Sequence, residues 1–207
     1  MTPIILEIFT DYIWPWCYLC TVRMEKLRAA YEIEFKYTLF PLHPETPEEG
    51  ISLEKLFAGR SIDIAASQAR LAKLMKEEGL PYNAERSMTY NSRLAQELAK
   101  WAETKPNGEA IHNALYEAYF VDGLNLALAE SLLQVVRRLG LPEEEAREAL
   151  LTRTFRDAVD QEWQRSREMG VTAVPTFVVG KRGLVGAQLY EELERLVVEG
   201  GASRLKW

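Results

Sequence analysis

The chain has 207 residues, a net charge of −6 and 47% hydrophobic residues, a balance that fits a folded globular protein and excludes a disordered one. Because nucleic acids and anionic membranes attract basic surfaces, this charge argues against both as partners. No stretch has the roughly 18 apolar residues that a membrane span requires. The first residues lack the basic start and cleavage site of a signal peptide, so we expect a cytoplasmic protein.

The N-terminal part predicts a βαβ unit. Ile4–Phe9 is apolar and β-branched and is followed by Thr10 and Asp11, as in a short buried strand that ends in a turn. Pro15 suits a first helical position, and the apolar residues after it have helical spacing. Glu34–Phe40 alternates polar and apolar residues like a half-exposed strand. We expect these two strands to lie parallel in one sheet.

A long helical block separates this unit from a second α/β segment. Residues 41–50 hold three prolines and a glycine, which predicts a loop. Ser52 to about Glu168 has a helical pattern, and no sheet strand is expected between Ala65 and Ala149. Breaks are expected at Gly79–Pro81, Lys105–Gly108, Asp122–Gly123 and Gly140–Pro142.

The C-terminal part predicts a ββα segment. Thr176–Val179 and Leu184–Val185 have β character around a glycine-containing turn, and Leu189–Val198 is an amphipathic helix. The chain therefore predicts an α/β fold in two domains. Residues 1–50 and 170–207 form one discontinuous domain with a mixed sheet and helices on both faces, and residues 51–169 form an inserted, all-helical domain.

Cys17 and Cys20 are the only thiols in the chain. Such a pair in a reducing compartment is redox-active, metal-binding or simply packed. Residues three apart in a helix share one face, so a disulfide is within reach, yet small free cysteines also pack as hydrophobic residues. A zinc site needs four ligands, and His43 and His112 have no recognised spacing. We expect no metal and no cofactor.

Asp11–Tyr18 (DYIWPWCY) resembles the DsbA-like thioredoxin-fold family, and within it the FrnE-like branch, whose members read D-x-x-C-P-W-C-Y here. The resemblance continues, in order along nearly the whole chain, at Phe40–Pro44, Asn91–Ala95, Leu115–Phe120, Gly170–Phe177 and Gly186–Gln188. It implies a thioredoxin fold with a helical insertion and thiol–disulfide oxidoreductase activity. It also implies a cis peptide at Val174–Pro175, facing the start of the first helix. The residues alone, without the resemblance, favour a plain edge proline at a strand start over a cis-proline at position 175.

One position departs from the family pattern. Trp14 stands where members carry the nucleophilic cysteine, while Cys17 keeps the resolving position and Cys20 lies one turn deeper. Free N–H groups and the helix dipole stabilise a thiolate at a helix start. We therefore expect Cys17, near the third helical residue, to keep part of this lowering of its pKa, and Cys20 to keep none. Related 2-hydroxychromene-2-carboxylate isomerases and kappa-class glutathione transferases carry serine at the position of Trp14 and use glutathione.

The candidate catalytic residues are Cys17 and Cys20, and the candidate substrate-binding residues are Trp14, Trp16, Val174, Pro175 and Arg93. The two tryptophans either pack around the helix start or cover a small-molecule pocket beside Pro175. Arg93 either holds an anionic ligand or is a surface charge. Asp11 is either a turn residue or an acid that tunes Cys17.

These residues and the resemblance together predict a thiol–disulfide oxidoreductase, weak or degenerate because of Trp14. Its partners would be protein thiols or disulfides, or a small thiol such as glutathione, and its oligomeric state is open between monomer and homodimer. Two alternatives stay open. One is a non-redox protein that binds a small molecule or a peptide on a degenerate thioredoxin fold, and the other is a glutathione-dependent isomerase or transferase.

Overall fold

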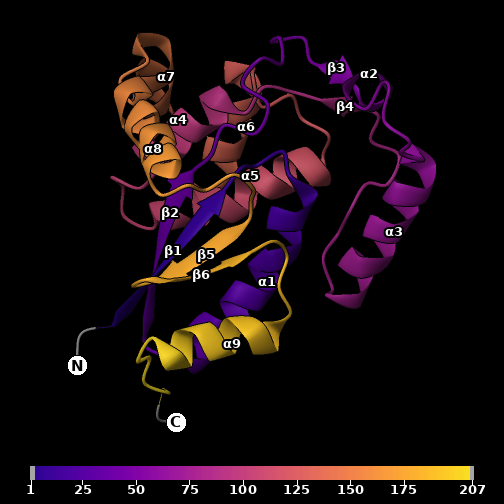
Figure 1. Cartoon of the computed structure of the whole chain (residues 1–207). Coiled ribbons are helices and arrows are strands. Elements are labelled where there is room, and N and C mark those ends of the chain that lie inside the picture. The colour runs from indigo at the N-terminus through magenta and orange to yellow at the C-terminus, as the bar shows by residue number, and fades with distance from the viewer. Residues whose placement is uncertain (1–2, 206–207) are drawn as a thin grey trace. The chain divides into compact units, whose positions relative to one another are not determined.

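The computed structural model describes residues 3–205 and divides into two compact units. Unit 1 contains the residues up to Leu42 and those from Glu162 onward, and unit 2 is His43–Gln161. The elements in chain order (Figure 1) are β1 (Ile4–Thr10), α1 (Pro15–Ala30), β2 (Ile33–Leu39), β3 (Ile51–Ser52), α2 (Leu53–Leu56), α3 (Ile64–Glu77), β4 (Met88–Thr89), α4 (Arg93–Ala102), the 3₁₀ turn η1 (Gly108–Ala110), α5 (Ile111–Phe120), α6 (Ala129–Arg138), α7 (Glu143–Thr152), α8 (Arg156–Glu168), β5 (Thr176–Val179), β6 (Arg182–Val185) and α9 (Tyr190–Glu199). Between residues 3 and 205, no helix is long and apolar enough to cross a bilayer.

Unit 1 is built on a four-stranded mixed sheet in the order β2-β1-β5-β6. β1 runs parallel to β2, with Ile8 opposite Tyr37, and antiparallel to β5, with Ile8 opposite Phe177. β5 and β6 form an antiparallel hairpin. This confirms that the N-terminal βαβ and C-terminal ββα segments share one sheet.

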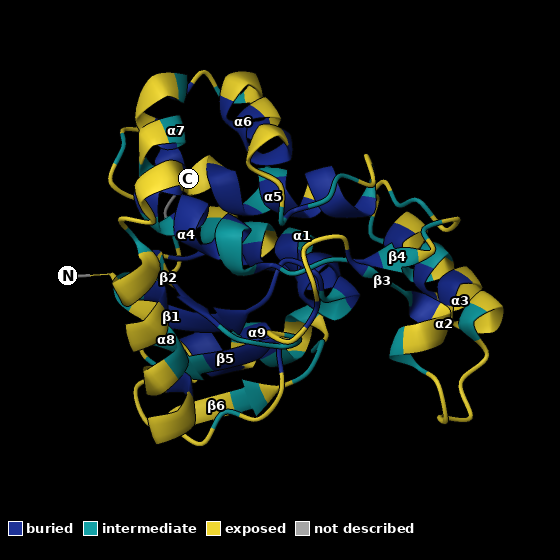
Figure 2. Ribbon diagram, turned by 90° about the horizontal axis from the view of Figure 1, so that it is seen from above, coloured by how far each residue is buried: buried dark blue, intermediate teal, exposed yellow. Residues whose placement is uncertain are grey.

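One face of this sheet is covered by α1 and α9. Leu6 and Ile8 point from β1 into a core that also contains Phe177 from β5, Leu27 from α1 and Leu193 from α9, all at most 1% exposed. The strands β1 and β5 are accordingly among the buried elements in Figure 2, while β6 at the sheet edge is exposed. Leu6 and Ile8 are two positions apart in β1 and therefore point to the same face of the sheet, the one that α1 and α9 cover.

The C-terminal half of α8 packs on the opposite face of the sheet. Helices therefore lie on both faces of the sheet, as predicted. Glu162 accepts a hydrogen bond from the Leu39 backbone N–H at 2.8 Å. Arg165 binds Glu7 of β1 with two hydrogen bonds, Nε–Oε1 at 2.6 Å and Nη2–Oε2 at 2.7 Å. Burial by itself raises the pKa of Glu7, but hydrogen bonds from Arg165, Thr38 and Lys36 outweigh it and lower the pKa to about 2.

Unit 2 is mostly helical. Its helices end close to the predicted breaks, with α3 ending at Glu77, α4 at Ala102, α5 at Phe120 and α6 at Arg138. Its helices α4, α5, α6 and α7 pack on one another, and its largest fully buried side chains are those of Tyr116, Tyr119 and Phe120 on α5.

The prediction that the insert is all-helical is wrong in one place. β3 and β4 pair antiparallel, with Ile51 opposite Thr89 and Ser52 opposite Met88, so a strand lies within Ala65–Ala149. A strand of two residues is too short to show a periodicity of two, and its pairing depends on a partner far away in the chain. The sequence pattern therefore carried no signal for it.

The unit boundaries also lie eight residues from those predicted at each junction, at 42/43 and 161/162 rather than 50/51 and 169/170. The loop after β2 belongs to unit 2 because the Asn91 side-chain amide donates hydrogen bonds to the carbonyls of Pro44 and Thr46, at 3.0 and 2.8 Å. The end of α8 belongs to unit 1 because Glu162 and Arg165 bond to the sheet. Neither set of contacts follows from local sequence pattern.

Candidate functional site at the start of helix α1

The segment between β1 and α1 is a tight turn organised by Asp11. Its carboxylate is fully buried and accepts hydrogen bonds from the backbone N–H groups of Ile13 (3.4 Å) and Leu42 (3.0 Å). The Trp14 N–H donates to the Asp11 carbonyl at 3.1 Å. Asp11 therefore acts as a turn residue, in the manner typical of aspartate, and its charge is also among the influences that raise the pKa of Cys17.

Trp14 is the N-cap of α1. Its backbone is extended (φ −101°, ψ 114°), and its carbonyl accepts hydrogen bonds from the N–H groups of Cys17 and Tyr18. Its side chain makes no capping hydrogen bond, since an indole donates and cannot accept from the helix. Both Trp14 and Trp16 are half-buried. They present part of an apolar surface at the helix start.

Cys17 is the third residue of α1 and is 1% exposed. Burial raises the pKa of the Cys17 thiol far above its ordinary range, and this outweighs the hydrogen bonds from the Thr10 side chain and the Asp11 backbone that lower it. The expectation of a lowered pKa for Cys17 is therefore wrong, because desolvation is the largest influence on this thiol and raises its pKa. At neutral pH Cys17 is a protonated thiol and a poor nucleophile.

Cys20 lies one turn further along and is completely buried. It belongs to the core of unit 1, together with Leu6, Ile8, Met24 and Phe177. No disulfide joins it to Cys17. This environment is the one expected for a thiol that packs as a small hydrophobic residue.

Val174 and Pro175 lie at the same end of the sheet as the start of α1. The peptide bond between them is cis. Thr176 pairs with Phe9, so the next position in this antiparallel register places Pro175 beside Thr10, where β1 ends. The Pro175 carbonyl accepts a hydrogen bond from the Gly186 N–H at 2.7 Å. The backbone of Val174 has no hydrogen-bond partner in the chain between residues 3 and 205.

Arg93 lies in unit 2, whereas the other candidates belong to unit 1. Its guanidinium donates hydrogen bonds to Glu97 (2.7 Å), to Asp160 (2.7 Å) and to the carbonyl of Arg156 (2.8 Å). Glu97 is 2% exposed and is also bound by Arg153 through two hydrogen bonds. Arg93 is thus engaged in internal ion pairs that join α4 to the start of α8.

Thr10 is a residue of this site that the sequence analysis did not identify. It is the last residue of β1, is 2% exposed, and its side chain hydrogen-bonds the Cys17 thiol. Its position directly before Asp11 was the available signal, because a strand end that precedes a helix start faces the first turn of that helix.

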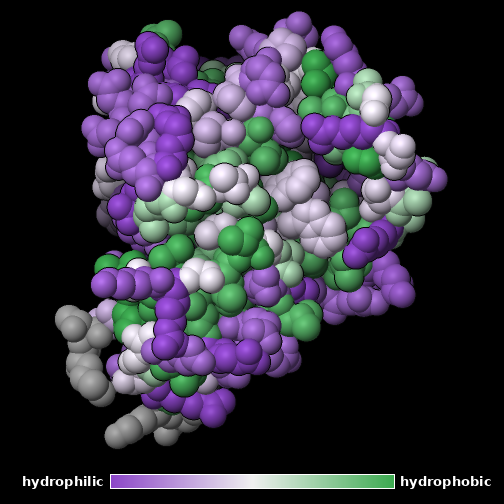
Figure 3. All heavy atoms as spheres, in the orientation of Figure 1, coloured by the Kyte–Doolittle hydropathy of each residue, from purple (hydrophilic) through white to green (hydrophobic). Residues whose placement is uncertain are grey.

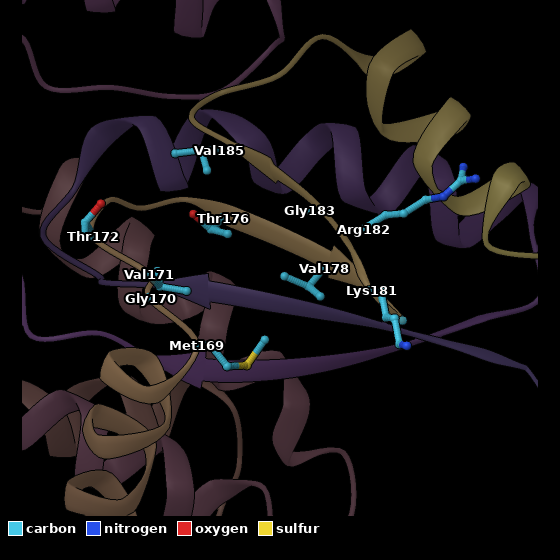
Figure 4. Close-up of a pocket in the computed structure, with 11 residues that line it drawn as sticks. Met169, Gly170, Val171, Thr172, Thr176, Val178, Lys181, Arg182, Gly183 and Val185 are labelled. Carbon is cyan, nitrogen blue, oxygen red and sulfur yellow. The ribbon is translucent and has the colours of Figure 1, made fainter.

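Unit 1 also has a shallow hollow of about 290 Å³ over β5 and β6. Val178 and Val185 form its apolar floor, and Met169 and Val171 border it from the segment before β5 (Figure 4). Apolar atoms gather over these strands in Figure 3, whereas α9 presents polar atoms. Trp14, Cys17 and Pro175 are not among the residues that line this hollow. Residues 3–205 contain no cluster of three His, Cys, Asp or Glu side chains that could hold a metal.

The family model of the DSBA-like thioredoxin domain matches residues 5–198. The chain belongs to the DSBA-like thioredoxin domain family. The uncharacterized protein YwbO of Bacillus subtilis is 23% identical over 193 residues, which are 93% of this chain and 94% of YwbO.

Two solved structures share the fold. The probable DsbA oxidoreductase SCO1869 from Streptomyces coelicolor has a TM-score of 0.88 at 26% identity, covering 99% of this chain and 93% of its own. The cytosolic disulfide reductase DsbM from Pseudomonas aeruginosa, solved with GSH, has a TM-score of 0.67 at 16% identity, covering 95% of each chain. The mixed α/β fold of the DSBA-like family, with its helical insertion, is thereby established for this chain.

Proposed function

We propose that this DSBA-like protein is a FrnE-like thiol–disulfide oxidoreductase of low rate, with Cys17 and Cys20 as its exchanging pair. The observation that carries the proposal is the placement of Cys17 in the first turn of α1, at the sheet end where the cis Val174–Pro175 peptide lies. In the reaction, both thiols lose a proton and together give two electrons to a substrate disulfide. Cys17 and Cys20 become a disulfide, and the substrate becomes two thiols.

The low rate has two physical causes. The N-cap position, where free N–H groups stabilise a thiolate, holds Trp14, which has no ionisable group. The thiol that remains near the helix start, Cys17, is 1% exposed and has a raised pKa. Attack on a substrate disulfide therefore needs both an opening of the site and deprotonation of Cys17.

Substrate binding would use the apolar surface of Trp14 and Trp16 and the backbone of Val174. The unpaired N–H and C=O of Val174 can bond an extended segment in the manner of an added strand. Both a protein thiol and a small thiol suit this surface. Because DsbM is a cytosolic disulfide reductase solved with GSH, we propose glutathione as the small thiol and a cytoplasmic setting for this chain.

A thiol titration with and without reductant tests this proposal. Under denaturing conditions, the oxidised protein should show no reactive thiol and the reduced protein two, and the change should be reversible with glutathione. Cys17→Ser and Cys20→Ser should each abolish a slow but measurable insulin reduction. Two thiols that stay reduced under every oxidant would contradict the oxidoreductase.

The second candidate is a non-redox binding protein on the same fold. It is favoured by the burial of both thiols, at 1% exposure for Cys17 and 0% for Cys20. In that case Cys17→Ser and Cys20→Ser leave function unchanged, and Trp14→Ala removes ligand binding. We do not propose the isomerase or transferase, because Trp14 supplies no hydroxyl where those lineages carry serine.

A further inference from the structure

Unit 2 contains a cavity of about 540 Å³ that the thiol site does not involve. It lies between α2, the first two turns of α3 and the segment before β4. Leu53, Ile64, Ala65 and Ala69 line it with apolar atoms, and Gln68 and Arg86 line it with polar ones. A pocket with apolar walls and a few fixed polar groups is the usual form of a small-molecule site.

Among the residues that the structure describes, Arg86 is the only basic one that lines this cavity, and it is held in place by neutral groups. Its Nη1 donates to the carbonyl of Met88 (2.8 Å) and to the hydroxyl of Tyr119 (2.7 Å). The guanidinium carbon lies 4.7 Å from the ring centroid of Tyr119 and 5.2 Å from that of Phe120. These contacts fix the position of the cation without neutralising it.

Arg86 has no carboxylate partner within residues 3–205, and its buried Nε has no hydrogen-bond partner there. Other arginines that bridge elements of this chain do have one: Arg153 binds Glu97 and Arg165 binds Glu7. A half-buried guanidinium without a counter-ion is unfavourable, because it has lost hydration and gained no charge partner. Binding of an anion would remove this cost.

Hydrogen bonds hold the Gln68 side chain in a fixed position where it lines the cavity. It is 7% exposed, its side-chain amide donates to the Arg86 carbonyl at 3.0 Å, and its side-chain oxygen accepts from the Tyr82 hydroxyl. Within residues 3–205, Glu54 is the only acidic residue in the lining, so the charges of Glu54 and Arg86 balance. This favours a ligand with one negative charge over a polyanion, which Glu54 would repel.

We propose that this cavity binds a small monocarboxylic acid with an apolar body. The carboxylate pairs with the guanidinium of Arg86, which suits planar carboxylates. The hydrocarbon part lies along Leu53, Ile64 and Ala65. No residue of the thiol site takes part, so this proposal and the proposed oxidoreductase can fail independently.

Titration calorimetry with octanoate and with its neutral analogue octanamide tests the proposal on the full chain. Octanoate should bind with a stoichiometry of one, and octanamide at least about tenfold more weakly, since a charged hydrogen bond is lost. Arg86→Met should weaken octanoate binding by a similar factor. Arg70→Met is the matched control, because Arg70 lies exposed on α3 outside the cavity lining, and its Kd should equal that of the wild type.

Arg86→Met also removes packing on Tyr119 and Phe120, so a second variant keeps the test decisive if that protein does not fold. Ala69→Phe fills the cavity from an exposed position on α3 and should abolish octanoate binding while the Tm stays near that of the wild type. The proposal is overturned if wild type does not bind octanoate or binds octanamide as tightly. It is also overturned if folded Arg86→Met or Ala69→Phe binds octanoate like the wild type.

Discussion

Single residues determine the chemistry of the helix start. Trp14 occupies the N-cap of α1, and its side chain makes no capping hydrogen bond because an indole donates and does not accept. Cys17 is close to those groups, yet burial raises its pKa instead of the helix lowering it. The start of α1 therefore holds an N-cap residue with no ionisable group and, in its first turn, a thiol whose pKa burial raises.

Trp14→Cys should restore fast exchange. A thiol at the N-cap lies at the positive end of the helix dipole, which lowers its pKa, and we expect it to lie within disulfide reach of Cys17. We expect a rise of about tenfold or more in the rate of dithiol-coupled insulin reduction. Trp14→Ser is the control, because it removes the indole and adds no thiol. Equal gains in both variants would mean that Trp14 only shields Cys17.

Glu7 should stabilise the protein in a pH-dependent way. Its pKa is lowered to about 2 in the fold from an ordinary 4.5, so its contribution is complete above about pH 4.5 and is lost as the pH falls toward 2. Glu7→Gln should lower the free energy of unfolding by about 2–3 kcal/mol at pH 7. The difference should vanish near pH 2. Urea unfolding across this pH range measures it.

Glu34→Gln serves as the control for that series, because Glu34 lies exposed on the neighbouring strand β2. It should change the free energy of unfolding by less than about 0.5 kcal/mol at every pH. A Glu7→Gln penalty that stays constant from pH 7 to pH 2 would contradict the role given to the carboxylate charge.

At the scale of elements, η1 can lie close to the end of α4 only because residue 108 is a glycine and has no side chain. Gly108 is buried, and a Cβ at this position would lie 1.7 Å from the Ala102 carbonyl oxygen. The chain can pass the C-terminus of α4 this closely only with glycine there. This contact positions α5, which carries the largest buried aromatic side chains of unit 2.

Gly108→Ala should therefore separate η1 from α4 and destabilise the protein by about 2–3 kcal/mol, as overpacking does. Gly183→Ala in β6 is the matched control, because its Cβ would meet its nearest atoms at 3.6 and 3.7 Å, an ordinary contact. It should change stability by less than about 0.5 kcal/mol. Thermal and urea unfolding followed by circular dichroism measure both, and equal effects would refute the steric argument.

At the scale of the whole molecule, both thiols lie inside unit 1 and can report on its opening. Cys17 lines the turn after β1, and Cys20 lies in the core between the sheet and its helices. Reagents in solution reach them only when this packing opens. Their reactivity is therefore a property of the fold's stability rather than of the two residues alone.

Iodoacetamide labelling of the reduced protein should be at least about a thousandfold slower in native buffer than in urea, since opening costs several kcal/mol. The labelling rate should rise with urea in parallel with the loss of circular dichroism. Ser61→Cys supplies an exposed thiol as an internal standard for rapid labelling. Rapid native labelling of Cys17 or Cys20 would show that the site opens without unfolding. Mass spectrometry of peptides separates the three thiols.

The sequence by itself determined the elements of unit 1 and the family. Ile4–Phe9, the helix from Pro15 and Thr176–Val179 each carry a local pattern, and the structure places β1, α1 and β5 there. The sequence also predicted the breaks in the helical block, because glycine and proline affect the backbone conformation of adjacent residues. The position of Trp14 at the helix N-cap was predictable as well, because it depends only on neighbouring residues.

Tertiary structure alone decided the β3–β4 pair, the unit boundaries and the state of Cys17. The strand at Met88 forms because Ile51 and Ser52 lie beside it, and the boundaries shift because Asn91 and Arg165 bond to distant segments. The Cys17 pKa is set by desolvation, which depends on everything packed around the thiol. Local periodicity reports which face of an element is apolar, but not which distant group covers it or how completely it excludes water.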